Sequence, residues 1–144
     1  MSSTNITYIS NFYSQEESIE MFTKLSKCPF KQPIIKVRGK PYRPLRKSCS
    51  YGDMDLDGHA KIGAHKDDEP TLDQTVDIAT LSFGACRDMI FSKKGCKSVR
   101  KALEAGSILL MHDQKEWTHA IPPQPCVKEP RICLTFRRVW SSLQ

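Results

Sequence analysis

The chain has 144 residues, with 22 Lys and Arg against 16 Asp and Glu, a net charge of +6 and 39% hydrophobic residues. This length predicts a single domain over residues 1–144. The longest aliphatic run, residues 108–111, is far shorter than the ~20 apolar residues that cross a bilayer, and no secretion signal opens the chain. We therefore expect neither a membrane protein nor a secreted one, and we expect the six scattered cysteines to be reduced thiols.

The first expected element is a helix. Ser14 and Glu17 form a capping-box pattern, apolar residues follow at helical spacing, and Pro29 stops the helix soon after residue 27. Residues 33–45 alternate short apolar pieces with glycine and proline, which indicates a hairpin or an irregular arm.

The remaining chain has the pattern of short strands. β-like runs occupy residues 76–83, 89–92, 107–111 and 132–139, and their separators carry Gly, Pro or charge. A helical turn is expected only near residues 99–103. One helix followed by many short strands predicts an α+β, mainly β fold, with a barrel or jelly roll supported by the helix.

Charge is unevenly placed along the chain. Residues 31–47 carry seven basic side chains and no acid, residues 53–77 carry eight acids against two lysines, and residues 93–101 are basic again. Two interpretations remain open. The basic runs are either a solvated surface or two arms that grip phosphates around an acidic, cation-binding centre.

A candidate metal site lies in the H-x-D pattern formed by His65 and Asp67. In a strand these two side chains point to one face, and His112 or His119 can supply a third ligand. Two histidines and one carboxylate form the facial triad of non-haem Fe(II) oxygenases, and zinc hydrolases use the same ligand types. The metal therefore stays open at this point.

The strand expected near the C-terminus has one apolar and one polar face. Period-two alternation places Ile132, Leu134 and Phe136 together, and puts Arg131, Cys133, Thr135 and Arg137 on the other face. A dicarboxylate lying along the strand would satisfy both arginines, because guanidinium groups bind carboxylates bidentately. The alternative is an edge strand with its arginines in water.

At these residues the chain resembles the AlkB family of Fe(II)/2-oxoglutarate dioxygenases, and most closely its homologue 2 branch. The motifs that carry the resemblance are Ile-Gly-Ala-His-Lys-Asp-Asp-Glu (62–69), Leu-Ser-Phe-Gly-Ala-Cys-Arg-Asp (81–88), Gly-Ser-Ile-Leu-Leu-Met (106–111), Trp-Thr-His (117–119) and Pro-Arg-Ile-Cys-Leu-Thr-Phe-Arg (130–137). Upstream, Arg-Lys-Ser-Cys-Ser-Tyr-Gly-Asp (46–53) is similar to the same branch.

The resemblance implies a double-stranded β-helix (jelly-roll) catalytic core over residues 62–139, preceded by a helix and a nucleotide-recognition arm over residues 1–61. It implies that Fe(II) is held by His65, Asp67 and His119. It further implies that 2-oxoglutarate is held by Arg131, Thr135 and Arg137, and that the substrate pocket includes Asp68.

The chemistry implied by the resemblance is oxidative demethylation of 1-methyladenine and 3-methylcytosine in DNA, with RNA as a further candidate substrate. O₂ and 2-oxoglutarate are consumed, and succinate, CO₂ and formaldehyde are released. The base must leave the duplex to reach the metal. A monomeric, nuclear repair enzyme is the expectation that follows.

Two departures from the family pattern matter. Only residues 54–61 separate Asp53 from Ile62, where the family has a longer segment with a strand whose Asn and Tyr help bind 2-oxoglutarate. We therefore expect that strand to be missing, with Tyr51 as a substitute contact. A catalytically impaired chain that binds metal or nucleic acid without turnover is the alternative to an active enzyme.

The second departure is at the tip of the arm. Arg38, followed by Gly39 and Lys40, stands where the family inserts an aromatic wedge into the gap left by the flipped base. A guanidinium can stack on a base or bind a phosphate. This predicts weaker flipping from duplexes and a preference for single strands.

Overall fold

The structure, a computed structural model, describes residues 5–31, 35–42, 46–49 and 52–140. One helix and twelve strands follow in the order β1 (Ile6–Ile9), α1 (Gln15–Leu25), β2 (Ile35–Val37), β3 (Lys40–Tyr42), β4 (Arg46–Cys49), β5 (Gly52–Asp55), β6 (Ile62–His65), β7 (Ile78–Gly84), β8 (Arg87–Ser92), β9 (Val99–Leu103), β10 (Ser107–Met111), β11 (Thr118–Ile121) and β12 (Arg131–Phe136). Within the described residues no helix is long and apolar enough to span a membrane.

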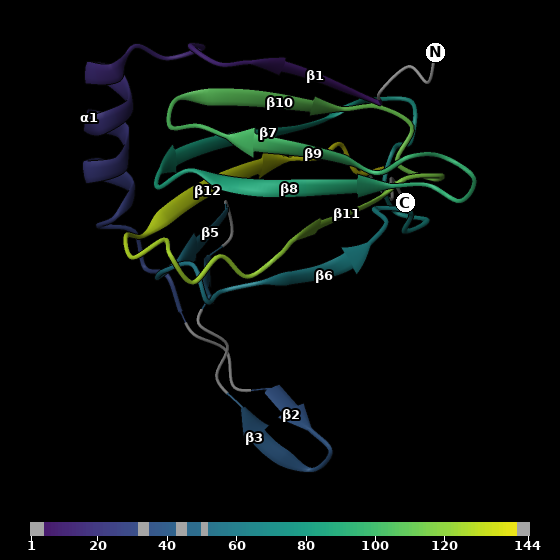
Figure 1. The fold of residues 1–144 in the computed structure, drawn as a ribbon, viewed down its shortest axis with the longest axis horizontal. Helices are drawn as coiled ribbons and strands as arrows, with labels where there is room; N and C mark the ends of the chain where they lie inside the picture. The colour runs from purple at the N-terminus through teal and green to yellow at the C-terminus, as the bar shows by residue number, and fades with distance from the viewer. Residues whose placement is uncertain (1–4, 32–34, 43–45, 50–51, 141–144) are drawn as a thin grey trace.

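The strands form two main antiparallel sheets and one separate ribbon (Figure 1). The larger sheet has the order β1-β10-β7-β12-β5-β4, and the smaller has the order β6-β11-β8-β9. Neighbours in the sheets come from distant parts of the chain, as when β12 pairs with both β7 and β5. Two facing sheets with such crossovers are a jelly roll, which confirms the expected fold class.

The main core fills the space between the two sheets. It combines residues of the larger sheet with residues of the smaller one and of the loop before β11: Ile78, Met89, Phe91, Leu103, Leu109, Met111, Trp117 and Ile121. Strand alternation explains this composition, because every second side chain of β8 and β10 is buried.

Helix α1 covers the other face of the larger sheet. Its N-cap Ser14 accepts a hydrogen bond from the Glu17 amide, and the Glu17 side chain accepts one from the Ser14 amide, as the capping box predicts. Phe22 and Leu25 pack against a second apolar cluster that includes Phe83. The helix ends at Leu25, close to the expected stop.

The hairpin expected in the basic arm is present, since β2 and β3 pair around a tip at Arg38 and Gly39. In Figure 1 this ribbon projects below the two sheets. Both tip residues have positive φ angles, 52° and 78°, as a tight turn between twisted strands requires.

Two expectations about the strands are wrong. Residues 99–103 form strand β9 rather than a helical turn, because their alternation buries Leu103 beside β8. The strand expected to be missing next to β12 is also present in place, since β5 pairs with β12 and β4 pairs with β5. The short segment before Ile62 therefore still completes the sheet.

Candidate active site

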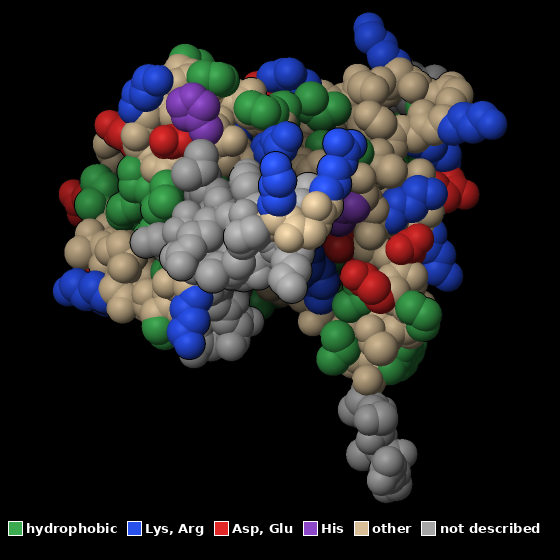
Figure 2. Space-filling view, turned by 90° about the horizontal axis from the view of Figure 1, so that it is seen from below, with side chains coloured by type: hydrophobic (Ala, Val, Ile, Leu, Met, Phe, Trp, Pro, Cys, Tyr) green, Lys and Arg blue, Asp and Glu red, His purple; other side chains and the backbone are tan. Residues whose placement is uncertain are grey.

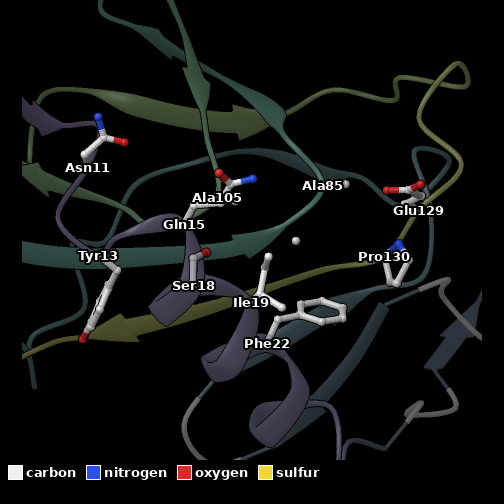
Figure 3. A pocket seen from close by; sticks show the side chains of 11 residues that line it. Asn11, Tyr13, Gln15, Ser18, Ile19, Phe22, Ala85, Ala105, Glu129 and Pro130 are labelled. Carbon is white, nitrogen blue, oxygen red and sulfur yellow. The ribbon is translucent and has the colours of Figure 1, made fainter.

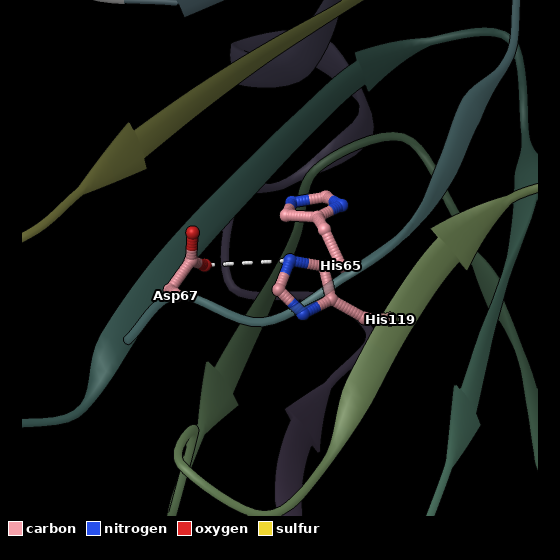
Figure 4. Close-up of side chains that lie close together, drawn as sticks. All are labelled: His65, Asp67 and His119. Carbon is pink, nitrogen blue, oxygen red and sulfur yellow. Dashed lines mark ion pairs between the residues drawn. The ribbon is translucent and has the colours of Figure 1, made fainter. Parts of the chain in front are cut away.

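The three expected metal ligands lie together between the sheets. His65 is the last residue of β6, His119 lies in β11, and these two strands pair with the histidines directly opposite each other. One donor atom from each of His65, Asp67 and His119 lies within 4.8 Å of the others (Figure 4). The sequence prediction of the trio's proximity is therefore supported by geometry.

Asp67 reaches this position by a different route from the one expected. Strand β6 ends at His65, so Asp67 is not on its face but in the loop that follows. The side-chain amide of Gln74 donates a hydrogen bond to the Asp67 carbonyl at 2.9 Å, which helps to hold this loop in place. Asp67 is 4% exposed, so the loop places a buried carboxylate next to the two histidines.

The alternative histidine, His112, lies elsewhere. Its Nδ1 is 2.8 Å from an Asp77 carboxylate oxygen, and its Nε2 is 2.9 Å from the Thr7 hydroxyl. These contacts are at the edge of the larger sheet beside β1. His112 therefore joins neighbouring segments, and His119 supplies the third donor of the trio.

Hydrogen bonding and burial prepare both imidazoles to donate lone pairs. Nδ1 of His65 lies 2.8 Å from the Gly63 carbonyl. Because a carbonyl only accepts, Nδ1 is the donor in this contact, and Nε2 is the ring nitrogen available to a metal. Burial lowers the pKa of His119 to about 4, against an opposing effect of Asp67, so its ring is neutral at pH 7.

The residues fit a divalent cation. Oδ2 of Asp67 and Nδ1 of His119 are buried and have no hydrogen-bond partner within the described part of the chain. Oδ2 of Asp67 is 3.3 Å from Nε2 of His119, and Oδ1 is 3.4 Å from Arg137. A cation would satisfy the orphaned carboxylate oxygen, and a set of two imidazoles and one carboxylate suits Fe(II) as well as Zn(II).

One cavity of about 80 Å³ joins the trio to the polar face of β12. Its walls include His65 and His119 together with Arg131, Thr135 and Arg137. The alternation expected for this strand is confirmed, because Leu134 packs on the opposite side beneath α1. Candidate metal ligands and candidate 2-oxoglutarate ligands thus face the same enclosed space.

Arg131 is already engaged by the protein. Its side chain is 1% exposed; Nη1 donates to Oδ2 of Asp55 at 3.3 Å and Nη2 donates to the Ser82 hydroxyl at 3.2 Å. The remaining nitrogen, Nε, is buried without a partner in the described residues. Arg131 and Asp55 are direct partners in the register of β12 and β5.

A second buried arginine, Arg87, stabilises the loops behind the site. It donates to the carbonyls of Asp57, Ala60 and Pro122 at 3.2, 2.6 and 2.9 Å, and Nε donates to the Gln124 side chain. Its Nη1 also lies 3.8 Å from Asp55. Neither Arg87 nor Asp55 was predicted as a site residue. The alternation of Gly-Asp-Met-Asp in residues 52–55 was the signal in the sequence for a strand whose acidic side chains could face Arg131.

The other predicted residues are more dispersed. Tyr51 lies outside the described residues. Asp68 is exposed, next to Asp67 in the loop, and is not part of the cavity wall. Arg38, Gly39 and Lys40 are exposed on the projecting hairpin. Their contact with a nucleotide remains a prediction.

A basic groove borders the trio. Its walls include Lys66, which follows His65, and Thr118, which precedes His119, together with Lys93, Lys94 and Lys115. Lys93 pairs with Glu116, which raises the pKa of the lysine and lowers that of the carboxyl. Seen from the hairpin side, Lys and Arg side chains are spread across the molecule (Figure 2).

A second, mainly apolar hollow lies away from this chemistry. A cavity of about 540 Å³ opens between α1 and the turn after β7, with Ile19 and Phe22 on the helix side (Figure 3). Glu129 is its only charged wall residue. Its walls offer no set of donors comparable to His65, Asp67 and His119, so the active-site assignment rests on the smaller cavity.

Comparison with known proteins agrees with this geometry. A family model described as the 2OG-Fe(II) oxygenase superfamily matches residues 55–137, and the chain belongs to that superfamily. Among curated relatives, it is 39% identical over 94 residues to the DNA oxidative demethylase ALKBH2 of Bos taurus, covering 58% of this chain and 34% of the relative.

A further relative and one solved structure extend the comparison. The alpha-ketoglutarate-dependent dioxygenase alkB homolog 3 of Homo sapiens is 38% identical over 88 residues, covering 53% of this chain and 31% of the relative. The fold matches a prolyl hydroxylase from Trichoplax adhaerens with a TM-score of 0.66 at 11% identity, covering 95% of this chain and 84% of that one. The chain spans about a third of the length of the curated relatives it matches.

Proposed function

We propose that this chain is an Fe(II)- and 2-oxoglutarate-dependent oxidative demethylase of alkylated bases, with 1-methyladenine and 3-methylcytosine in DNA as substrates. The observation that carries the proposal is the trio of His65, Asp67 and His119, whose two histidines line the same cavity as Arg131. A single domain, a monomeric state and a nuclear setting belong to the same proposal.

The protein's own residues would divide the work as follows. His65, Asp67 and His119 would hold the iron, and Arg137 would orient Asp67 through the contact at 3.4 Å. Arg131 and Thr135 of β12, together with Arg137 just after it, would hold 2-oxoglutarate. When bound, Fe(II) and 2-oxoglutarate supply the oxidation of the N-methyl group by O₂, which releases succinate, CO₂ and formaldehyde. Burial between the sheets keeps bulk water from the reacting groups.

Basic side chains beside the trio support a nucleic-acid substrate. The lysines of the basic groove lie next to residues of β6 and β11, and Arg38 and Lys40 extend from the projecting hairpin. Phosphate contacts from such groups supply affinity without sequence preference. They would hold a strand while one base enters the site.

The test is turnover of a methylated oligonucleotide. The purified chain is incubated with Fe(II), ascorbate, 2-oxoglutarate and a 3-methylcytosine oligonucleotide, and succinate and repaired base are measured. We expect His65→Ala to abolish both products. His59→Ala is the matched control, because His59 lies on an exposed turn beside Asp57 and outside the trio.

Other outcomes separate the alternatives. Oligonucleotide binding without succinate would refute turnover and favour the catalytically impaired form. Activity with Zn(II) and without 2-oxoglutarate would favour a hydrolase. The proposed preference for single strands is refuted if 1-methyladenine repair is faster in duplex DNA and Arg38→Ala leaves that rate unchanged.

A further inference from the structure

The Arg131 guanidinium is shared between the cavity and an internal carboxylate. Asp55 is 4% exposed and is not part of the cavity wall, whereas Arg131 is. Its Oδ2 lies 3.3 Å from Arg131 and 3.8 Å from Arg87, so one carboxylate sits between two buried arginines. Asp55 therefore offsets the positive charge of Arg131, the residue that would bind a ligand, from the side away from the cavity.

Arg131 keeps N–H groups for a ligand, but its charge is already paired. Nη1 donates one hydrogen to Asp55 and Nη2 donates one to Ser82, while Nε is buried without a partner among the described atoms. A guanidinium carries five N–H groups, so donors remain for an acceptor on a ligand whether or not that acceptor is charged. A charged acceptor gains less than it would from an unpaired arginine, because Asp55 already offsets the positive charge.

We propose that Asp55 is a specificity-determining residue of the cosubstrate site, and that it lowers the site's preference for 2-oxo acids with a second carboxylate. The proposal rests on the proposed function, because it assigns the Arg131 end of the cavity to the cosubstrate. Asp55 holds the charge that a distal carboxylate would otherwise neutralise, so the site accepts 2-oxo monoacids nearly as well as 2-oxoglutarate.

The test compares two ligands that differ only at the distal end. Binding of 2-oxoglutarate and of 2-oxopentanoate, which has a methyl group in place of the second carboxylate, is measured by calorimetry on the Zn(II)-loaded chain. In the wild type we expect affinities within about tenfold of each other, which corresponds to 1.4 kcal/mol. In Asp55→Asn the preference for 2-oxoglutarate should grow by about tenfold or more.

The ratio of affinities isolates the effect from general changes in folding. Asp88→Asn is the matched control, because it removes a carboxylate that pairs with Arg100 at the surface and is not part of the cavity wall. That variant should leave the ratio unchanged. An unchanged or smaller ratio in Asp55→Asn overturns the proposal.

The wild type alone also tests it if Asp55→Asn does not fold. A preference for 2-oxoglutarate of about a hundredfold or more in the wild type overturns the proposal. Failure of both ligands to bind overturns it together with the cosubstrate assignment. Binding with the expected ratios but no demethylation would overturn only the proposed function.

Discussion

Acidification is expected to destabilise the metal-free chain through His119. Burial lowers the pKa of this imidazole from 6.5 to about 4 in the folded chain, whereas the unfolded chain keeps the ordinary value. Between these two values the unfolded state binds one more proton than the folded state, so stability falls as the pH falls. The loss is about 1.4 kcal/mol for each pH unit, or about 3 kcal/mol over the whole window.

Urea denaturation of the chelator-treated chain between pH 7.5 and 4.5 measures this loss. The fluorescence of Trp117, which is 5% exposed, reports unfolding. His119→Gln removes the titrating group, so its stability should fall less steeply over the same window. Carboxylates that titrate below this range, such as Asp57 and Asp73, are common to both proteins and cancel in the difference. Equal slopes in the two proteins would refute the reasoning.

Three further predictions concern the metal, the buried arginine and the crowded turn. Mn(II) at about a hundred times its dissociation constant should stabilise the wild type by about 2.7 kcal/mol, as measured by urea denaturation. Asp67→Asn should gain little of this stability, because the carboxylate ligand is lost. An equal gain in both proteins would place the metal elsewhere. Arg87→Met should cost about 3 kcal/mol or more, because three carbonyls lose their donor and Asp55 loses a nearby positive charge, whereas Arg100→Ala at the surface should cost less than about 1 kcal/mol. Similar losses in the two variants would contradict the assigned burial. Gly84→Ala should lower Tm more than Gly95→Ala. Both glycines have φ near +80°, but of the two only Gly84 is crowded: a Cβ added there would lie 2.6 Å from the Pro130 carbonyl oxygen. Equal shifts in Tm would be inconsistent with this crowding.

Local patterns were sufficient for several parts of the structure. The capping box at Ser14 and the alternation along β12 depend on residues close together in sequence, and both are observed as expected. The trio was also found from sequence, because its spacing and flanking motifs resemble a known family. The helical turn expected at residues 99–103 shows the limit of local patterns, because pairing with β8 decides that segment.

Strand and helix patterns in the sequence thus determined the class of fold, its H-x-D motif indicated the metal-binding residue types, and its charge gave the basic character of the chain. Only the tertiary structure decided what lies against Arg131. Asp55 is 76 residues away in sequence, and it reaches the guanidinium because β5 pairs with β12 in one register. A shift of one residue would turn Asp55 to the opposite face of the sheet. Strand pairing between distant segments is set by the packing of the whole molecule. For this reason the sequence alone indicated a missing strand beside β12, where the structure has β5 with its two aspartates.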